Sequence, residues 1–440
     1  MAGSHVIDVE NEVMPDPAGR ILELLPAMPS EAVPDWAGAR WVGAVDLESL
    51  NGYSQLRLQE SLGYSRARLL VRNGAAVRGF IELDATDGSL ARSQVEAAAA
   101  ELPAAAAPRA ASATPSITVI VCTRDRAECL RKALEAILRL DYPNFDVIVV
   151  DNAARSSDTR DMVRKEFPDP RLTLISERRP GLSHARNAGL RHAQGDIVAY
   201  TDDDVVVDEG WLHAIAAGFE QAPDVACVTG LVPAGELRSQ AQGYFDSRVG
   251  WSKTVAPKVY SLADPPADLP VFPFCVGAFG TGANFALDRR AALALGAFDT
   301  ALGVGTRTGG GEDLDMFTRV ILSGRSLVVQ PSAVVWHRHR ADLEELIVQA
   351  RGYGNGLGAW LAKIFMNPRT ARMALARAPR GAAYFLRNIR SHRSGAGVPG
   401  SREPRNPVEA KALRTELVYV ALGPLNYLLQ RRLGRRRRAG

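Results

Sequence analysis

The feature that most constrains this chain is a regular alternation of buried strands and amphipathic helices between residues 117 and 200. Short apolar segments at 117–121, 145–150, 172–176 and 197–200 have the pattern of buried strands. The segments 126–140, 158–167 and 183–194 lie between them and carry apolar residues at helical spacing. This order predicts an α/β unit with a mainly parallel sheet. Ligands of such sheets bind beyond the carboxyl ends of the strands, so the residues that follow each strand are the first candidates for a site.

Carboxylates follow three of these four strands. Asp125 follows the first strand, Asp151 the second, and Asp202, Asp203 and Asp204 the fourth. Thr123 and Arg124 lie beside Asp125 at the first strand end. A single aspartate at such a turn often caps a helix, which is the simpler interpretation of Asp125 or Asp151 alone. Three consecutive aspartates repel one another, and a bound divalent cation is the least costly way to keep them ionised. Because phosphate oxygens usually complete the shell of such a cation, we expect a nucleotide or nucleotide-sugar ligand.

Three further groups of residues are candidates for the same site. Glu312 and Asp313 begin a helix directly after three glycines at 309–311. The first turn of a helix favours acids anyway, but three glycines suit a loop that reshapes around a ligand. Arg186 lies near the start of a helix and either binds phosphate or is exposed on a solvated helix face. His337 ends a strand, where histidine is more often structural than a ligand.

The sequence on either side of this unit differs in texture. Two β-rich runs flank Asn73-Gly74, which predicts a hairpin in a small β-rich unit over residues 1–100. An Ala/Pro-rich stretch at 101–115 has the composition of a linker. We therefore predict an α/β domain at 116–340 and a helical, Arg-rich region at 341–440. Within that last region Tyr353, Trp360 and Phe365 either line an acceptor groove or pack against the body.

Charge is unevenly distributed along the chain. The net charge is +4, but residues 369–440 hold 17 basic and three acidic residues, which leaves −10 for residues 1–368. Apolar and aromatic residues beside the arginines of this tail suit an anionic membrane surface, and a plain solvated tail is the alternative. We expect no nucleic-acid partner, because no RNA- or DNA-binding motif accompanies the arginines. The four cysteines have no paired spacing, and we recognise neither a signal peptide nor a spanning segment. We therefore expect a cytoplasmic protein, peripheral on the inner face of the plasma membrane.

The order of these motifs resembles glycosyltransferase family 2, a group of metal-dependent, inverting sugar transferases with a GT-A fold, the Rossmann-like fold of nucleotide-diphospho-sugar transferases. Five segments carry the resemblance: a T-x-x-R-like loop at 122–126, a V-V-D strand end at 149–151, a G-x-x-x-A-R-N-x-G segment at 181–189, a D-x-D motif at 202–204 and an E-D motif at 312–313. Single motifs of this kind are weakly specific, but five in this order and spacing are strong. The resemblance covers about residues 117–340.

The resemblance implies a role for each candidate. The residues implied to bind the nucleotide sugar are Thr123, Arg124, Asp125, Asp151, Arg186, Asp202 and Asp203. Asp202 and Asp204 would hold Mn²⁺ or Mg²⁺, with His337 as a further ligand. Asp313 would be the general base, and Glu312 would position donor or acceptor. Asn152 stands where many members have a second acid, and the middle residue of the D-x-D motif is itself Asp, so which carboxylates touch the metal stays open.

Two function classes follow from these observations. The first is an inverting glycosyltransferase that uses a UDP-, GDP- or dTDP-sugar and an acceptor that the sequence does not identify. The second is a non-catalytic nucleotide-sugar-binding or membrane-surface scaffold module. A sugar nucleotidyltransferase is the nearest enzymatic rival, but the glycine-rich phosphate loop expected after its first strand is missing from the sequence.

Overall fold

A nine-stranded sheet forms the centre of the molecule, and its strands follow the sequence pattern closely. The computed structural model describes residues 19–104, 111–393 and 407–439. Of these residues, those within 381–408 and 435–440 are described by their backbone alone. The strands are β7 (Ile117–Thr123), β8 (Phe145–Asn152), β9 (Leu172–Glu177), β10 (Ile197–Thr201), β11 (Val205–Val207), β12 (Val225–Leu231), β13 (Lys258–Tyr260), β14 (Asn284–Asp288) and β15 (Ser326–His337). Their order across the sheet is β11-β15-β12-β14-β10-β7-β8-β9, and β13 pairs with β15.

Most strands of this sheet run in one direction. β9, β8, β7 and β10 are parallel neighbours, while β14 lies antiparallel between β10 and β12. β12 and β15 are again parallel to each other, so their carboxyl ends lie at the same edge as that of β10. The predicted α/β core with a mainly parallel sheet is confirmed, and its binding edge carries the ends of β7, β8, β10 and β15.

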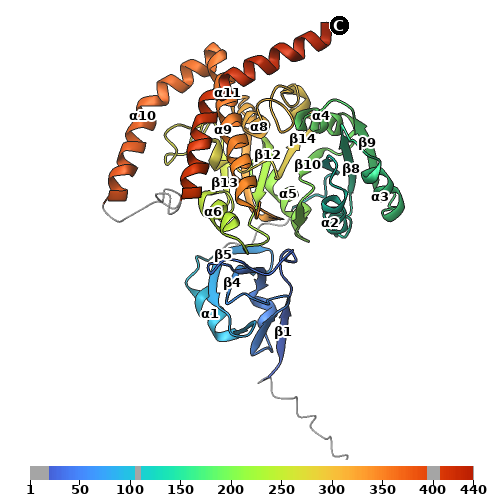
Figure 1. The fold of residues 1–440 in the computed structure, drawn as a ribbon, viewed down its shortest axis with the longest axis vertical. Helices are drawn as coiled ribbons and strands as arrows, with labels where there is room; N and C mark the ends of the chain where they lie inside the picture. Colours follow the sequence, from blue (N-terminus) through green and yellow to red (C-terminus); the bar gives the residue numbers. More distant parts are fainter. Residues whose placement is uncertain (1–18, 105–110, 394–406, 440) are drawn as a thin grey trace, which may run out of the picture.

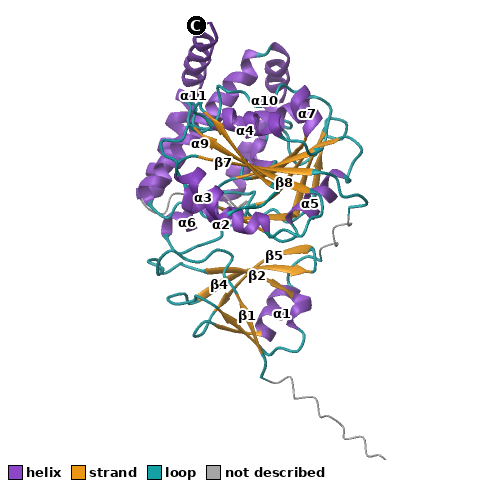
Figure 2. Cartoon of the chain, turned by 90° about the vertical axis from the view of Figure 1, so that its right-hand side faces the viewer, coloured by secondary structure: helices purple, strands orange, loops and turns teal. Residues whose placement is uncertain are grey.

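Helices cover both faces of the sheet (Figure 2). One face is packed by α2 (Ala127–Leu138), α3 (Asp158–Glu166) and α5 (Trp211–Phe219), whose buried side chains meet those of β7, β8 and β10. The other face is packed by α4 (Leu182–His192), α7 (Arg289–Ala294) and α8 (Glu312–Leu322). Because the parallel strands are buried on both faces, their sequences are nearly continuous apolar runs rather than alternating ones.

The N-terminal β-rich unit stands below the α/β core in Figure 1 and has its own apolar core. Its elements are β1 (Ile21–Leu24), β2 (Trp41–Asp46), β3 (Gln55–Leu58), β4 (Arg66–Asn73), β5 (Ala76–Asp84), β6 (Ser89–Ala91) and α1 (Arg92–Ala100). β4 and β5 pair antiparallel across Asn73-Gly74, so the predicted hairpin is confirmed. Part of the expected linker, residues 105–110, lies outside the described residues.

Three helices follow the sheet and form one side of the core in Figure 1: α9 (Leu343–Met366), α10 (Pro368–Arg393) and α11 (Pro407–Ala439). The expected C-terminal helices are therefore present. Among the described residues we find no helix whose length and apolar character would allow it to cross a membrane.

Glycines allow α9 to make close backbone contacts on two sides. A Cβ at Gly354 or Gly358 would lie 2.1 Å from the carbonyl oxygen of Glu416 or Val420 on α11. On another side of α9, a Cβ at Gly356 would lie 2.7 Å from the carbonyl carbon of Gly310, in the loop before α8. Only glycine fits such approaches without movement of the backbone. The glycines of α9 therefore lock it between α11 and the start of α8.

Candidate active site

The carboxyl ends of β10 and β15 bring the predicted metal ligands together. Val205 on β11 pairs with His337 at the end of β15, and this pairing sets the histidine beside the residues that follow β10. Asp202, Asp204 and His337 each offer one ligand atom, and these atoms lie within 4.8 Å of one another. His337 Nε2 is 3.3 Å from Asp204 Oδ1. Residues separated by more than 130 positions thus form one group of two carboxylates and one imidazole.

The charges of this group are unequally compensated. Burial raises the pKa of Asp202, and the negative charge of Asp204 raises it further. Burial also opposes ionisation of Asp204, but His337 and Arg126 lower the pKa of that carboxyl below its usual range. Burial opposes protonation of His337, yet the Asp204 carboxylate raises the pKa of the imidazole. A cation placed between these carboxylates would relieve the penalty on Asp202, so the donor set and its charge fit a divalent metal.

Asp203 does not belong to this group and has partners in the β7–α2 segment. The Thr123 hydroxyl donates a hydrogen bond to Asp203 Oδ2 at 2.6 Å, and the Arg126 guanidinium pairs with Asp203 Oδ1. Burial raises the pKa of Asp203 to about 7. Arg126 also reaches Asp204 Oδ2 at 2.8 Å, so one arginine ties two aspartates of the triplet to the β7–α2 loop. Arg126 was not among the predicted site residues, although it closes the T-x-x-R-like loop, and that position was the available signal.

The remaining predicted nucleotide-binding residues lie at the ends of β7 and β8. Thr123 and Asp151 are partners in the parallel register of these strands. Asp151 is buried, and no described residue forms a hydrogen bond with its Oδ1. Burial raises the pKa of Asp151, with a smaller contribution from the charge of Asp125. Asp125 has a φ of 54° and accepts a hydrogen bond from the backbone N–H of Arg155 at 2.8 Å, while Arg124 Nε lies 3.7 Å from its Oδ2.

Asn152 connects this edge to the loop before α4. Its side-chain amide donates hydrogen bonds to the carbonyl oxygens of Glu177 and Arg179, at 3.1 and 2.8 Å, and its Oδ1 accepts one from Gly181 N at 3.0 Å. An aspartate could accept the bond from Gly181 but could not donate the other two. The amide at this position, in place of a carboxylate, therefore fixes the path of the chain into α4.

Arg186 lies at the centre of the site. Only 3% of this residue is exposed, so the interpretation as an exposed arginine on a solvated face is wrong. Its Nη1 is 3.0 Å from Glu312 Oε1, and its Nη2 donates to the carbonyl oxygen of Gly282 at 2.8 Å and lies 3.8 Å from Asp202 Oδ1. The guanidinium also lies 5.2 Å from the centre of the Phe285 ring. Arg186 thus links the group of Asp202, Asp204 and His337 to the acids of α8.

The first turn of α8 presents Glu312 and Asp313 to the same space. Asp313 Oδ2 accepts a hydrogen bond from Gly282 N at 2.9 Å, and Oδ1 accepts one from Leu314 N at 2.8 Å. Glu312 is buried; burial first and the charge of Asp313 second raise its pKa to about 7. Gly282 therefore connects Arg186 to Asp313: its carbonyl oxygen accepts a hydrogen bond from Arg186, and its N–H donates one to Asp313.

The glycines before α8 have a packing role. Gly309 and Gly311 have φ values of 66° and 90°, and a Cβ at Gly311 would lie 2.6 Å from the carbonyl oxygen of Gly356 on α9. The positive φ values and this contact give Gly309 and Gly311 a structural reason, while a loop that reshapes around a ligand stays a prediction. The contact also places the start of α8, with Asp313, directly against α9.

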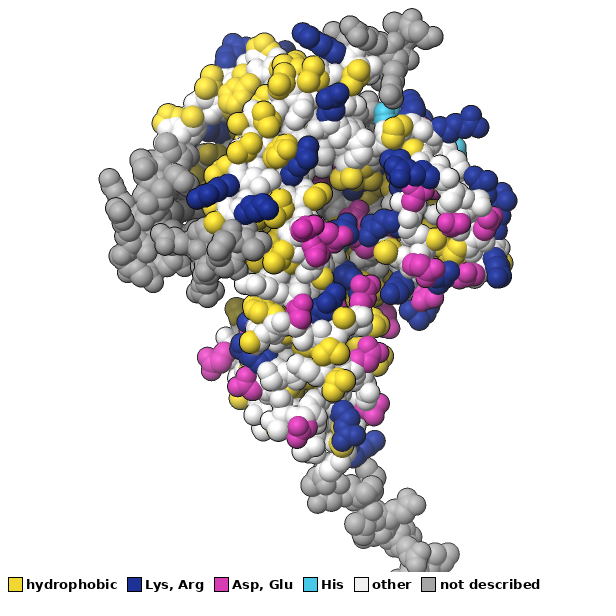
Figure 3. All heavy atoms as spheres, in the orientation of Figure 1, with side chains coloured by type: hydrophobic (Ala, Val, Ile, Leu, Met, Phe, Trp, Pro, Cys, Tyr) yellow, Lys and Arg dark blue, Asp and Glu magenta, His cyan; other side chains and the backbone are white. Residues whose placement is uncertain are grey.

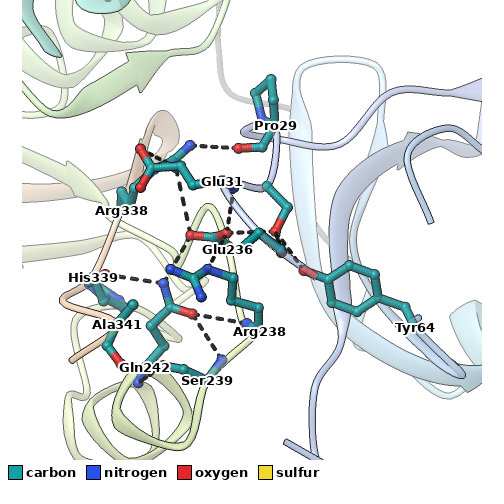
Figure 4. Close-up of polar contacts among 12 residues, drawn as sticks. Pro29, Glu31, Tyr64, Glu236, Arg238, Ser239, Gln242, Arg338, His339 and Ala341 are labelled. Carbon is teal, nitrogen blue, oxygen red and sulfur yellow. Dashed lines mark hydrogen bonds and ion pairs between the residues drawn. The ribbon is translucent and has the colours of Figure 1, made fainter. Parts of the chain in front are cut away.

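The segment after His337 is fastened to the N-terminal unit (Figure 4). Arg338 donates to the carbonyl oxygen of Pro29 at 2.6 Å and pairs with Glu31 at 2.7 Å. Glu236 is 3% exposed and accepts hydrogen bonds from Ser30 Oγ at 2.6 Å and from Gln242 Nε2 at 3.0 Å. Contacts with the N-terminal unit therefore fix the chain directly after β15, the strand that ends in His337.

Comparison with known proteins agrees with this geometry. Residues 118–291 match the family described as Glycosyl transferase family 2. A pre-mycofactocin glycosyltransferase of Mycobacterium tuberculosis is 30% identical over 299 residues, covering 67% of this chain and 58% of that protein. An uncharacterized protein of Sinorhizobium fredii is 39% identical over 119 residues, covering 26% of this chain and 13% of the relative. The chain thus spans less than two thirds of the length of either relative.

Two solved structures overlap part of the chain. One is a mannosyltransferase from Pyrobaculum calidifontis in complex with GDP-Man and Mn²⁺, with 22% identity, coverage of 71% of this chain and 88% of that chain, and a TM-score of 0.45. The other is GalNAc-T7 with UDP, GalNAc and Mn²⁺, with 14% identity, coverage of 56% and 51%, and a TM-score of 0.40.

The sequence match covers β7 to β10, with the strand ends that carry Thr123, Asp151 and the three aspartates, and it continues through β14 into α7. The acids of α8 and the histidine of β15 lie beyond the matched residues in sequence but complete the same site in space. Residues 118–291 therefore form a domain of glycosyl transferase family 2.

Proposed function

We propose that this protein is an inverting glycosyltransferase that moves a sugar from a nucleoside diphosphate sugar to an acceptor hydroxyl. The observation that carries the proposal is the single linked site formed by the Asp202, Asp204 and His337 group, Arg186, Gly282 and Asp313. A candidate cation site and a candidate base are thus joined through one buried arginine and one backbone unit.

Asp202, Asp204 and His337 would hold Mn²⁺ or Mg²⁺. When bound, the metal neutralises charge on the departing diphosphate. The Thr123, Arg124, Asp125 and Asp151 group lies on the β8 side of these ligands and would contact the nucleoside. Arg186 and Arg126 contribute fixed positive charge close to the same carboxylates, and such preorganised charge stabilises a developing anion without reorganisation.

Asp313 would act as the general base. Its carboxylate takes the proton of the acceptor hydroxyl while the acceptor oxygen forms a bond to the anomeric carbon. On the opposite face, the bond from that carbon to the diphosphate oxygen breaks, and the nucleoside diphosphate leaves with the electron pair. One displacement of this kind inverts the anomeric centre. Glu312 would position the reactants through its ion pair with Arg186.

The Asp313→Asn substitution tests the base. We expect the rate of nucleoside diphosphate release in the presence of acceptor to fall by a factor on the order of 10² to 10⁴, with donor binding retained. Asp161→Asn, an exposed acid in the first turn of α3, is the matched control and should leave the rate unchanged. Full activity of the Asp313→Asn protein would sink the assignment.

Metal dependence and reaction class are tested separately. A thermal-shift screen of UDP-, GDP- and dTDP-sugars with Mn²⁺ identifies the donor, and a chelator should then abolish its binding. Release of a nucleoside diphosphate indicates transfer, whereas release of pyrophosphate would indicate a nucleotidyltransferase. Donor binding without turnover would favour the non-catalytic alternative.

We also propose that α11 contacts an anionic membrane surface. Apolar side chains lie exposed along this helix: Leu417, Val418, Leu422, Leu425, Leu428 and Leu433. Lys411, Arg414 and Arg432 are exposed on the same helix, and Figure 3 shows hydrophobic and basic side chains together over the C-terminal helices. Exposed apolar residues beside cations suit an interfacial helix.

Vesicle co-sedimentation tests this contact. The protein should pellet with phosphatidylglycerol vesicles at low salt and less with phosphatidylcholine vesicles. Leu422→Glu with Leu425→Glu should abolish pelleting, whereas Leu62→Glu, an 81% exposed position on the N-terminal unit, should not. Equal pelleting of all three proteins would contradict the proposal.

A further inference from the structure

An exposed aromatic ring lies at the junction of α6 (Gln240–Arg248) and α9, which pass beside each other in Figure 1. Tyr353 of α9 is 47% exposed, and its ring stacks on Phe245 of α6 at 5.9 Å between centroids and 28° between planes. Phe245 itself is 6% exposed and also contacts Trp251 at 6.1 Å and His339 at 4.7 Å. We call Phe245, Trp251, His339 and Tyr353 the aromatic cluster. Its outer ring is open to solvent and is supported from beneath by buried rings.

The aromatic cluster adjoins the candidate active site at two points. The ring of His339 lies 5.4 Å from that of His337, a proposed metal ligand. Gly352, the neighbour of Tyr353 on α9, packs on Gly309 in the loop that leads into Asp313; a Cβ at Gly309 would lie 3.3 Å from the Gly352 Cα. Burial raises the pKa of the Tyr353 hydroxyl, even though much of the ring is exposed. The aromatic cluster therefore adjoins both the candidate metal ligand His337 and the loop that leads into Asp313.

Polar groups without partners accompany the exposed ring. His339 is 2% exposed, and neither of its ring nitrogens has a hydrogen-bond partner among the described residues. Gln349 of α9 donates to the Tyr353 hydroxyl at 3.3 Å, while its Oε1 is buried and unpaired within the described part of the chain. Buried groups of this kind normally find a partner, so we expect ordered water beside His339. The amide of Gln349 is only partly buried and can also bond to a ligand.

The position of the cluster distinguishes acceptor from donor. The candidate nucleoside residues lie at the ends of β7 and β8, on one side of β10 in the sheet, whereas β15 lies on the other. His339 follows β15, and the aromatic cluster extends from it towards α9. A donor bound over β7 and β8, with its diphosphate at the metal ligands, would leave this cluster for the second substrate.

We propose that the acceptor is itself a sugar or glycoside, whose pyranose ring stacks on Tyr353 and whose hydroxyls bond to the side-chain amide of Gln349. A pyranose combines an apolar C–H face with a rim of hydroxyls, which matches an exposed ring with a polar amide at its edge. The acceptor hydroxyl nearest Asp313 gives its proton to that carboxylate, and its oxygen forms a bond to the anomeric carbon of the donor as the nucleoside diphosphate leaves. This inference rests on the proposed function and adds the chemical class of the second substrate.

Steady-state kinetics with the full chain tests the inference. The donor is the nucleotide sugar selected by thermal shift, and the acceptor probes are p-nitrophenyl glycosides of glucose, galactose, mannose and N-acetylglucosamine. p-Nitrobenzyl alcohol serves as a non-sugar acceptor of similar aromatic character. The wild-type protein should release nucleoside diphosphate faster with at least one glycoside and not with the alcohol. Tyr353→Ala should raise KM for that glycoside about tenfold or more, with kcat and donor KM within twofold of wild type.

Two further variants separate recognition from structure. Tyr353→Phe keeps the ring and should retain a KM within threefold of wild type. Phe365→Ala removes a 51% exposed ring from the same helix, away from the cluster, and should have no effect. An unchanged acceptor KM in Tyr353→Ala overturns the inference, as does donor hydrolysis without transfer to any glycoside. Failure of the wild-type protein to bind or turn over any donor would instead refute the proposed function.

Discussion

Arg186 is the residue on which the two halves of the site depend. Its guanidinium is buried, yet it faces Glu312 at 3.0 Å and Asp202 at 3.8 Å, so it is the cation closest to both acids. Breaking a buried ion pair by removing one partner leaves an uncompensated charge, which costs more than the pair contributed. The buried Glu312 carboxyl would then have no arginine beside it, and the Gly282 carbonyl would lose its donor.

We therefore expect Arg186→Gln to lower the free energy of unfolding by about 3–5 kcal/mol. Arg191→Gln provides the comparison, because Arg191 belongs to the same helix, is 53% exposed and lies 3.8 Å from Glu177. That change should cost less than about 1 kcal/mol. Urea denaturation of both proteins measures the difference, and equal midpoints would show that the buried pair is not needed for stability.

The positions of single residues in this site were easier to predict from the sequence than the contacts between their side chains. Strand ends predicted that Asp151 and the aspartate triplet share one edge of the sheet, because the direction of parallel strands determines that edge, and the structure places them there. The pairing of Arg126 with Asp203 and Asp204 could not be predicted, because it spans 77 and 78 residues of sequence and depends on side-chain direction. The role of Asn152 was hidden for a similar reason, since its partners belong to the next strand and loop.

At the level of elements, glycine determines how the C-terminal helices meet. Gly358 of α9 lies against the backbone of α11, where a Cβ would be 2.1 Å from the Val420 carbonyl oxygen. The obstacle is backbone rather than a side chain, so the helices must separate to admit a methyl group. The sequence shows four glycines in α9, at 352, 354, 356 and 358, but not the elements that they contact. Helical spacing indicates which residues share a face of a helix, but it does not indicate what that face packs against.

Gly358→Ala should destabilise the protein by about 1–3 kcal/mol, even though alanine is the better helix former. Gly434→Ala on α11 is the control, because a Cβ there meets no atom within 4 Å. The control should be neutral or slightly stabilising. Thermal denaturation of the two variants distinguishes a packing cost from a general effect on helices, and a stabilised Gly358→Ala protein would contradict the close contact.

At the level of the whole molecule, the N-terminal unit is firmly attached to the family 2 domain. Arg68 of β4 pairs with Asp246 of α6 at 2.6 Å, and both side chains are buried. Arg72 forms two hydrogen bonds with Asp208, at 2.8 and 2.7 Å. An apolar cluster that includes Leu70 and Trp336 fills the space between the units. The β-rich unit itself was predictable from its hairpin, but this attachment was not, because the arginines of β4 look like ordinary strand residues in sequence.

Asp246→Asn should destabilise the protein by about 3–5 kcal/mol at neutral pH, because Arg68 would remain buried without a counter-charge. Burial opposes ionisation of Asp246, but Arg68 and, to a smaller extent, Lys253 lower the pKa of the carboxyl below its ordinary value of 3.8. Since the native pKa is the lower one, this stabilisation is present above pH 3.8 and is lost as the pH falls through the native pKa.

The difference between wild type and Asp246→Asn should therefore shrink below pH 3.8. Urea denaturation across a pH series measures this difference. Glu82→Gln, which removes the partner of Arg40 at a more exposed ion pair within the N-terminal unit, should change stability by less than about 1 kcal/mol. A difference that stays constant down to pH 2 would contradict the assigned ion pair.

The division of α9 into separate stripes has a consequence for engineering. Gly354 and Gly358 serve the contact with α11, Gly352 and Gly356 serve the contact with the start of α8, and Gln349 and Tyr353 occupy a third stripe one helical turn apart. Libraries restricted to that third stripe leave every close backbone contact of the helix intact. Substrate preference and thermal tolerance should therefore be adjustable independently within a single helix.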